Sequence, residues 1–146
     1  MQRHAQHAQL PSLRVGSHNI RGFGDLTRSA APARMQALLL EWERLRLGVV
    51  LLQETHASVL SQYKIEGWLL QLSRQAGFPG WHVLWAHSGG AAGGVAVLVR
   101  RSLINSHQLV LHDDRVWRSA SGRLLAVPMD WGGPQTVCVQ RVSAFW

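Results

Sequence analysis

The sequence has little cysteine and little acid, and both shortages limit what the protein can be. Cys138 is the only cysteine in 146 residues, so no intrachain disulfide can form and no cysteine cluster can bind a metal. A single cysteine favours a reducing, intracellular compartment. Asp and Glu together number 8 against 15 Lys and Arg, which gives a formal net charge of +7. The partners that this charge favours are therefore polyanions.

The positive charge is almost entirely arginine. Lys64 is the only lysine, and the arginines are spread along the chain without a long basic run. An excess of cationic side chains favours nucleic acid, because neutralising phosphates releases condensed counterions. A scattered pattern fits a solvated surface equally well. Charge alone therefore leaves nucleic acid as one of two open interpretations.

No segment has the pattern of a membrane span or a secretory leader. The uncharged segment between Arg74 and Arg100 is interrupted by Pro79, Gly80 and two histidines. The first residues lack the apolar core of a signal peptide. With 47% hydrophobic and 16% charged residues, the composition is that of a globular protein. We expect a loose N-terminal tail over residues 1–12, one domain over residues 13–146 and no membrane partner; the sequence sets no oligomeric state.

The order of the helix and strand patterns predicts an α/β domain that becomes β-rich toward its end. A strand is predicted over 13–20, a helix that begins at Pro32 and stops at Gly48, and a strand over 49–53 that is buried on both faces. A second helix is expected within 61–77, and further strands over 81–87, 95–100, 103–112, 123–131 and 135–142. This order favours a layered sheet of mixed strands over a doubly wound fold.

Two glycine clusters invite comparison with phosphate-binding loops, and neither has the neighbours that such a loop needs. The cluster over 89–94 is followed by Val95, where a Walker loop requires Lys and then Ser or Thr. The pair Gly22 and Gly24 is followed by Thr27, where a dinucleotide-binding loop has its third glycine. We interpret both clusters as flexible loops that join strands.

Asn19 and Glu54 each stand at the carboxyl end of a predicted buried strand. Such strand ends line a common crevice in an α/β sheet, and a carboxylate there needs a cleft, an arginine or a cation. Mg²⁺ takes few protein oxygens and fits this pair. Alternatively, Asn19 caps a turn and Glu54 pairs with a surface arginine such as Arg21. His56 is either a general base beside Glu54 or a solvated imidazole.

Four pieces of the sequence resemble a known family. They are "HNIRGF", "VVLLQETHA", "GGVAVLVRRS" and the later "SGRLLAVPMDWGG". In this order they resemble the endonuclease/exonuclease/phosphatase family, and most of all the apurinic-type endonuclease domain of non-LTR retrotransposons. The resemblance covers roughly residues 13–142, and "LQET" is its most specific part.

The resemblance implies a fold, a reaction and a site. The family has an α/β fold in which a sandwich of two β-sheets is flanked by helices. Its members hydrolyse phosphodiesters with Mg²⁺, and DNA is the substrate of the branch that this chain resembles. By this resemblance Glu54 holds the Mg²⁺, Asn19 helps to hold the metal and the scissile phosphate, and Arg21 is a candidate contact to phosphate or nucleic acid. A retroelement origin would imply a nuclear location.

The sequence departs from the family toward its end. Arg141, Ser143 and Phe145 stand where the family has Asn, Tyr and Pro, and neither Asp-x-Asn nor Ser-Asp-His occurs in the sequence. We therefore expect the N-terminal part of the domain, inactive on DNA, with one face of the first sheet exposed if the second sheet is missing. The alternative is a non-catalytic basic module that binds nucleic acid or a protein.

Overall fold

A computed structural model describes residues 12–28, 30–90, 92–132 and, for its backbone, 136–142. The predicted tail over 1–12 lies outside these residues except for Ser12, as do Ser143 and Phe145. The elements follow the order β1 (Val15–Asn19), α1 (Ala30–Arg44), β2 (Val49–Gln53), α2 (Val59–Gln75), β3 (Trp81–Ala86), β4 (Val95–Arg100), α3 (Arg101–Asn105), β5 (Leu109–Leu111), η1 (Asp113–Arg115), β6 (Trp117–Arg118), β7 (Leu124–Trp131) and β8 (Thr136–Val142).

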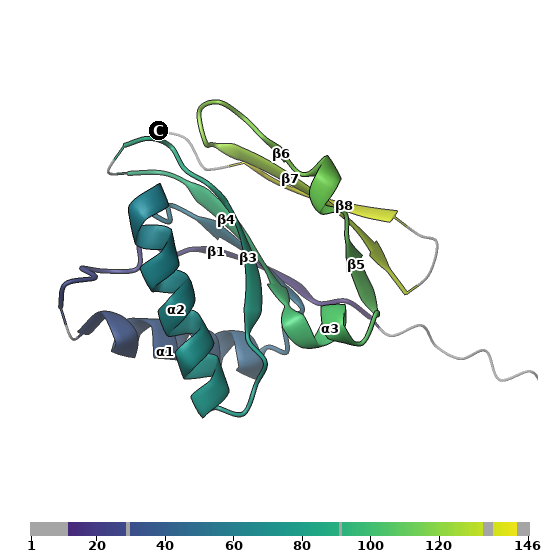
Figure 1. The fold of residues 1–146 in the computed structure, drawn as a ribbon, viewed down its shortest axis with the longest axis horizontal. Helices are drawn as coiled ribbons and strands as arrows, with labels where there is room; N and C mark the ends of the chain where they lie inside the picture. The colour runs from purple at the N-terminus through teal and green to yellow at the C-terminus, as the bar shows by residue number, and fades with distance from the viewer. Residues whose placement is uncertain (1–11, 29, 91, 133–135, 143–146) are drawn as a thin grey trace, which may run out of the picture.

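The first sheet has the strand order β1-β2-β4-β3 (Figure 1). β1 and β2 run parallel because α1 connects them, whereas β4 is antiparallel to both of its neighbours. The two central strands, β2 and β4, consist almost entirely of buried residues. Their continuous apolar runs are explained by this burial on both faces, and the predicted mixed sheet is confirmed.

Helices α1 and α2 cover one face of the first sheet. Met35, Leu39 and Trp42 recur at helical spacing along α1 and pack in one apolar cluster with Leu52 of β2 and Leu98 of β4. Ser58 begins α2 with a capping box, in which its hydroxyl accepts a hydrogen bond from the Ser61 N–H and its own N–H donates to the Ser61 hydroxyl. The helices therefore form an outer layer, as Figure 1 shows.

The second sheet covers the opposite face of the first. It has the order β5-β7-β6, and β8 also pairs with β7. Leu125, Val127 and Met129 alternate along β7 and pack with Val97 and Val99 of β4. The predicted α/β sandwich of two sheets flanked by helices is thus confirmed. The condition for an exposed face on the first sheet, a missing second sheet, does not hold, because residues 109–131 supply strands that bury that face.

The segment over 103–112 was predicted as one strand, and this is wrong for its first part. Residues 101–105 form the short helix α3, and only 109–111 form β5. Leu103 and Ile104 both pack against the apolar cluster between the sheets. Two successive residues can do so in a helical turn, whereas a strand would point one of the two side chains to its opposite face. Among the described residues, no helix has the length and apolar character needed to cross a membrane.

Candidate functional site

The parallel pairing of β1 and β2 brings Asn19 and Glu54 to the same edge of the first sheet. Asn19 is in register with Gln53, and the Ile20 N–H extends the pairing by donating to the Gln53 carbonyl at 3.2 Å. Glu54 follows Gln53 directly. The two residues predicted from their strand ends therefore lie at neighbouring ends of adjacent strands, as the sequence indicated.

The backbone around these residues takes the left-handed conformation at several non-glycine positions. Arg21 has a φ of 50°, Glu54 of 51° and His56 of 51°. Each such residue costs of order 1 to 3 kcal/mol and persists only where its surroundings determine it. The Gly22 N–H donates to the Glu54 carbonyl at 2.6 Å, which fixes the two loops to each other. Strain of this kind is concentrated in proteins at functional sites.

The side chains of Asn19 and Glu54 keep oxygens that a cation can use. Asn19 Oδ1 accepts a hydrogen bond from the Arg21 N–H at 3.2 Å, so the expected turn cap is present, and a second lone pair remains on that oxygen. The Glu54 carboxylate is 30% exposed and lies 3.9 Å from His56 Nε2. Its neighbour is thus the His56 ring, and no ion pair between Glu54 and Arg21 is found among the described residues.

Gln53 and Thr55, on either side of Glu54, are buried and hold the strand end in place. Gln53 is 5% exposed, and its Nε2 donates to the Ser17 hydroxyl at 3.0 Å and to the Leu51 carbonyl at 3.1 Å. Thr55 donates its N–H to the Gly94 carbonyl at 3.2 Å. The uncharged amide before Glu54 thus ties β2 to β1, and the glycine cluster before β4 packs against the site.

The structure gives a specific reason for glycine at position 94, where the sequence suggested only a flexible loop. Gly94 has a φ of +84°, and a Cβ there would lie 2.6 Å from Thr55 Oγ1. The loop at Gly22 to Thr27 is likewise held by its own contacts, since Asp25 Oδ1 accepts from the Thr27 hydroxyl at 2.6 Å. Hydrogen bonds from Thr27 lower the pKa of Asp25. Gly94 and the loop at Gly22 to Thr27 are therefore held by packing or hydrogen bonds, whereas Gly89 and Gly90 are exposed with open space around them, and neither cluster has a phosphate-loop sequence.

Arg34 is the residue of this region that the sequence analysis missed. It projects from α1, and its guanidinium donates to the carbonyls of Ile20 and Gly22. These contacts attach the loop after Asn19 to the helix layer. The available signal was weak, because Arg34 precedes the buried Met35 of the helical stripe and has the pattern of an ordinary solvated arginine.

The donor set fits Mg²⁺ better than a metal that needs a full protein cage. Among the described residues, no three His, Cys, Asp or Glu side chains gather in one place. Mg²⁺ is commonly held by one or two carboxylates, with water and substrate phosphate as the remaining ligands. Glu54 supplies a carboxylate and Asn19 an amide oxygen at the same sheet edge. These two oxygens are of the kind that a hard divalent cation takes from a protein.

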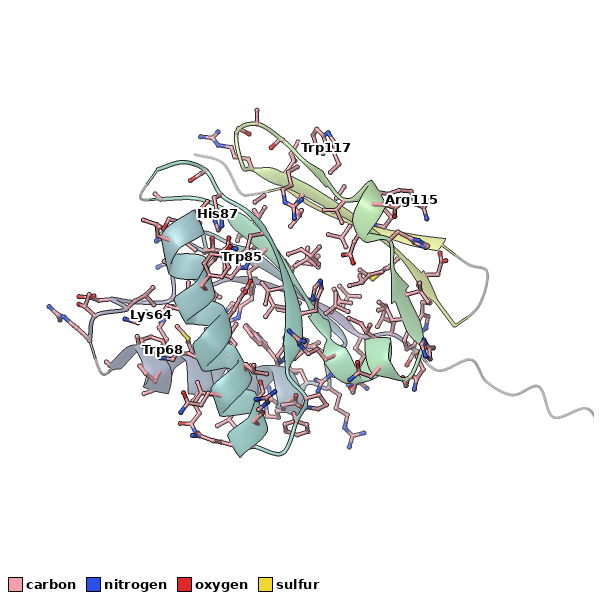
Figure 2. The ribbon with its side chains drawn as sticks, viewed as in Figure 1. Lys64, Trp68, Trp85, His87, Arg115 and Trp117 are labelled. Carbon is pink, nitrogen blue, oxygen red and sulfur yellow. The ribbon has the colours of Figure 1, made fainter. Side chains whose placement is uncertain are left out.

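His87 lies just beyond β3, and its surroundings shift its pKa. Its ring stacks on Trp85 with centroids 5.5 Å apart, and Nε2 is 2.6 Å from Gln62 Oε1. Figure 2 shows Trp85 and His87 close together beside α2. Burial, with a smaller effect of the Arg118 charge, lowers the pKa of His87. The folded protein therefore favours the neutral imidazole.

We predict that this imidazole makes the fold less stable in mild acid. The unfolded chain binds a proton at His87 near its ordinary pKa of about 6.5, whereas the folded chain binds it only at lower pH. Stability is therefore complete above that value and falls as the pH drops through it. The melting temperature between pH 7.5 and 5.5 should fall less in His87→Gln than in the parent. His107→Asn, at an exposed histidine, should keep the parent's pH dependence; equal slopes for all three proteins would contradict the prediction.

A match to a known family covers most of the chain. The sequence profile of the Endonuclease/Exonuclease/phosphatase family matches residues 16–137. Among curated proteins, none matches the sequence significantly.

Solved structures share the fold. Humanized TDP2 from D. rerio, carrying 14 mutations, has a TM-score of 0.52 and 16% identity over 88% of this chain and 48% of its own. An AP endonuclease from Archaeoglobus fulgidus has a TM-score of 0.51 and 15% identity, and the match covers 80% of this chain and 37% of that structure. D. rerio TDP2 complexed with a single-strand DNA product has a TM-score of 0.50 and 17% identity, and the match covers 88% of this chain and 44% of that structure. The chain thus spans less than half the length of these structures, and identities this low show the fold alone.

Proposed function

The chain belongs to the endonuclease/exonuclease/phosphatase family, and from this membership we propose that it forms the N-terminal part of a Mg²⁺-dependent phosphodiesterase domain that acts on DNA. The observation that carries the proposal is the parallel register of β1 and β2, which puts Asn19 and Glu54 at one sheet edge. The left-handed backbone at Arg21, Glu54 and His56 supports it, because three of the five described non-glycine residues with positive φ gather in these two loops, which the Gly22 N–H joins through the Glu54 carbonyl.

Each predicted site residue has a role in this proposal. Glu54 is the anionic ligand that would hold Mg²⁺, and Asn19 Oδ1 is the neutral oxygen beside it. When bound, Mg²⁺ supplies a Lewis acid that offsets charge developing on a phosphoryl oxygen. Arg21 is exposed in the loop after Asn19 and would contact a neighbouring phosphate of the bound DNA strand. Arg34 keeps this loop attached to α1 through two carbonyls.

DNA is the substrate class that the comparisons favour. One solved structure with the same fold is described as bound to a single-strand DNA product, and another is an AP endonuclease. The net charge of +7 agrees with a polyanionic partner. The motifs "HNIRGF" and "VVLLQETHA" support the further proposal that the chain derives from the retrotransposon branch of the family.

We propose that the 146-residue chain binds DNA and does not cut it at an appreciable rate. It contains no Ser-Asp-His and no Asp-x-Asn, the family elements for the general base and for orienting the water. Loss of a general base alone typically costs on the order of 10²- to 10⁴-fold in rate. His56, whose Nε2 lies 3.9 Å from the Glu54 carboxylate, is the histidine nearest to the proposed metal ligand, and it has none of the sequence context of the family's general base.

A nicking assay with a binding arm tests this function. Supercoiled plasmid with and without abasic sites is incubated with Mg²⁺ and either the parent chain or Glu54→Gln. We expect DNA binding that weakens steeply with salt, and no nicking that depends on Glu54. Glu54-dependent nicking would contradict the proposed inactivity while supporting the site. Absence of DNA binding at low salt would contradict the proposed partner.

A further inference from the structure

Strand β3 forms an open edge of the first sheet. It pairs with β4 on one side, and no described strand pairs with its other side. Arg118 Nε donates to the Trp85 carbonyl at 2.6 Å and Arg101 Nε to the Trp81 carbonyl at 3.2 Å. These carbonyls thus point away from β4. Because backbone direction alternates along an antiparallel strand, the N–H and C=O of Val83 point to the same edge.

A groove follows this edge along its whole length. One cavity of about 490 Å³ is lined by Gln62 of α2, by residues 82–87 of β3 and its end, and by Asp113 and Arg118. A second cavity of about 470 Å³ continues from it along α2 and shares Glu66, His82 and Val83 with the first. Figure 1 shows β3 between α2 and the strands of the second sheet. The open backbone of Val83 therefore lies where the two cavities meet.

The helix side of the groove has a hollow for one apolar side chain. Tyr63, Gly67 and Leu70 of α2 line the second cavity opposite Val83. A Cβ at Gly67 would meet no atom within 4 Å, and Tyr63 is 68% exposed. An added strand places the residue opposite Val83 on this helix-facing side, because directly paired residues share a face. That residue would enter the hollow above Gly67.

Two carboxylates and two arginines line the groove. Glu66 accepts a hydrogen bond from Trp85 Nε1 at 2.6 Å and Asp113 lies 3.9 Å from His82 Nε2, so both carboxylates have partners within the protein, whereas the described partners of Arg101 and Arg118 are neutral carbonyls.

Arg101 and Arg118 bind carbonyls two residues to either side of Val83, and each guanidinium has further donors that can bind a carboxylate. A second copy of this chain is a poor occupant, since antiparallel pairing centred on Val83 would bring Arg101 of one copy against Arg118 of the other. The net charge of +7 opposes self-association too. Acidic residues flanking the apolar one avoid this repulsion.

We propose that the β3 edge binds an extended peptide by strand addition, with the pattern acidic-x-apolar-x-acidic. The peptide backbone pairs with Val83, its apolar side chain occupies the hollow above Gly67, and its two carboxylates meet Arg101 and Arg118. This site lies on the opposite edge of the first sheet from β1. His87, at the far end of the first cavity, contacts the Ala57 backbone in the loop after Glu54, so it is the Val83 pairing and the hollow above Gly67, and not the whole groove, that are separate from the proposed phosphodiesterase site.

Fluorescence anisotropy with a labelled peptide tests this proposal on the full chain. The probe is fluorescein-Gly-Ser-Asp-Thr-Leu-Thr-Asp-Ser-Gly. We expect saturable binding that becomes at least about tenfold weaker when both Asp are replaced by Lys, as expected for two charge-assisted contacts, or when the Leu is replaced by Gly. Equal binding of the acidic and lysine peptides would overturn the proposal.

Two protein variants separate groove binding from a general loss of structure. Gly67→Leu fills the hollow at an open helix position, so it should weaken the peptide about tenfold or more while keeping or raising the melting temperature, since Leu is the better helix former. Arg101→Glu/Arg118→Glu should reverse the preference in favour of the lysine peptide. Undiminished binding to Gly67→Leu would overturn the proposal.

The same variant decides between a peptide and a nucleic acid as the occupant. We expect Gly67→Leu to bind a single-stranded oligonucleotide as tightly as the parent chain does, because the proposed DNA site lies elsewhere. An oligonucleotide that competes with the peptide and is weakened by Gly67→Leu would make the groove a nucleic-acid site and overturn the peptide proposal. Glu54→Gln should leave peptide binding unchanged, which keeps this test independent of the phosphodiesterase test.

Discussion

Gly122→Ala is expected to destabilise the fold by about 3 kcal/mol or more, and to lower the melting temperature by roughly 10 °C for a domain of this size. Gly122 lies in the turn between β6 and β7 and has a φ of +68°. A Cβ there would lie 1.8 Å from the carbonyl oxygen of His87 and 2.6 Å from the Ser88 nitrogen. Both are backbone atoms, which cannot move aside as a flexible side chain can.

The contact matters because it joins the two sheets. The turn at Gly122 belongs to the second sheet, and His87 immediately follows β3 of the first. Arg118 connects the same two regions through the Trp85 carbonyl. An alanine at Gly122 would therefore separate the turn from the end of β3 and open the apolar layer between the sheets.

Gly132→Ala is the matched control for this prediction. Gly132 has a φ of +66°, nearly that of Gly122, and a Cβ there would meet nothing within 4 Å. It should lose only about 1 to 2 kcal/mol, the cost of a left-handed alanine. Chemical denaturation of the three proteins measures the difference. Equal losses at the two glycines would show that the contact with His87 does not constrain the fold.

The first sheet and its helices could be predicted from the sequence because their signals are local. The run over 49–53 is apolar on both faces, and the period of 30–44 is helical, so each segment indicates its own structure. Strand β6 could not be predicted, since Trp117 and Arg118 form a strand only by pairing with Ala126 and Leu125 of β7. Two residues have no period, and their conformation depends on a distant partner.

The position of the candidate site could be predicted from the sequence, but the backbone conformation and the contacts that hold it could not. Asn19 and Glu54 follow from the rule that strand ends share an edge, and from the family resemblance. The left-handed backbone at Arg21 and Glu54 could not be predicted, because Arg and Glu have no preference for it and tertiary contacts impose it. Arg34 was missed for a related reason. Its partners are main-chain carbonyls, which exist at every residue and leave no mark in the sequence.

Divalent-cation binding is expected to weaken about 100-fold when Glu54 is replaced by glutamine. The amide has nearly the shape of the carboxylate but no formal charge, and Mg²⁺ depends on one or two carboxylates for its affinity. Replacing a residue that only hydrogen-bonds to a metal ligand typically weakens metal binding by about 10- to 100-fold, so replacing the ligand itself should weaken it by about 100-fold or more. Asn19→Ala should have a smaller effect, about tenfold, because a neutral oxygen is lost. Calorimetry with Mg²⁺, and Mn²⁺ as a spectroscopic substitute, measures both.

The control must remove one negative charge elsewhere, since a chain of net charge +7 repels every cation. Glu41→Gln does this at an exposed carboxylate that pairs with Arg44 at 2.6 Å. It should leave the cation affinity within about twofold, because a surface pair is screened by salt. Equal losses in both variants would mean that cations respond to overall charge alone. Asn19 and Glu54 would then be structural residues at a strand end, and the chain would be the non-catalytic basic module.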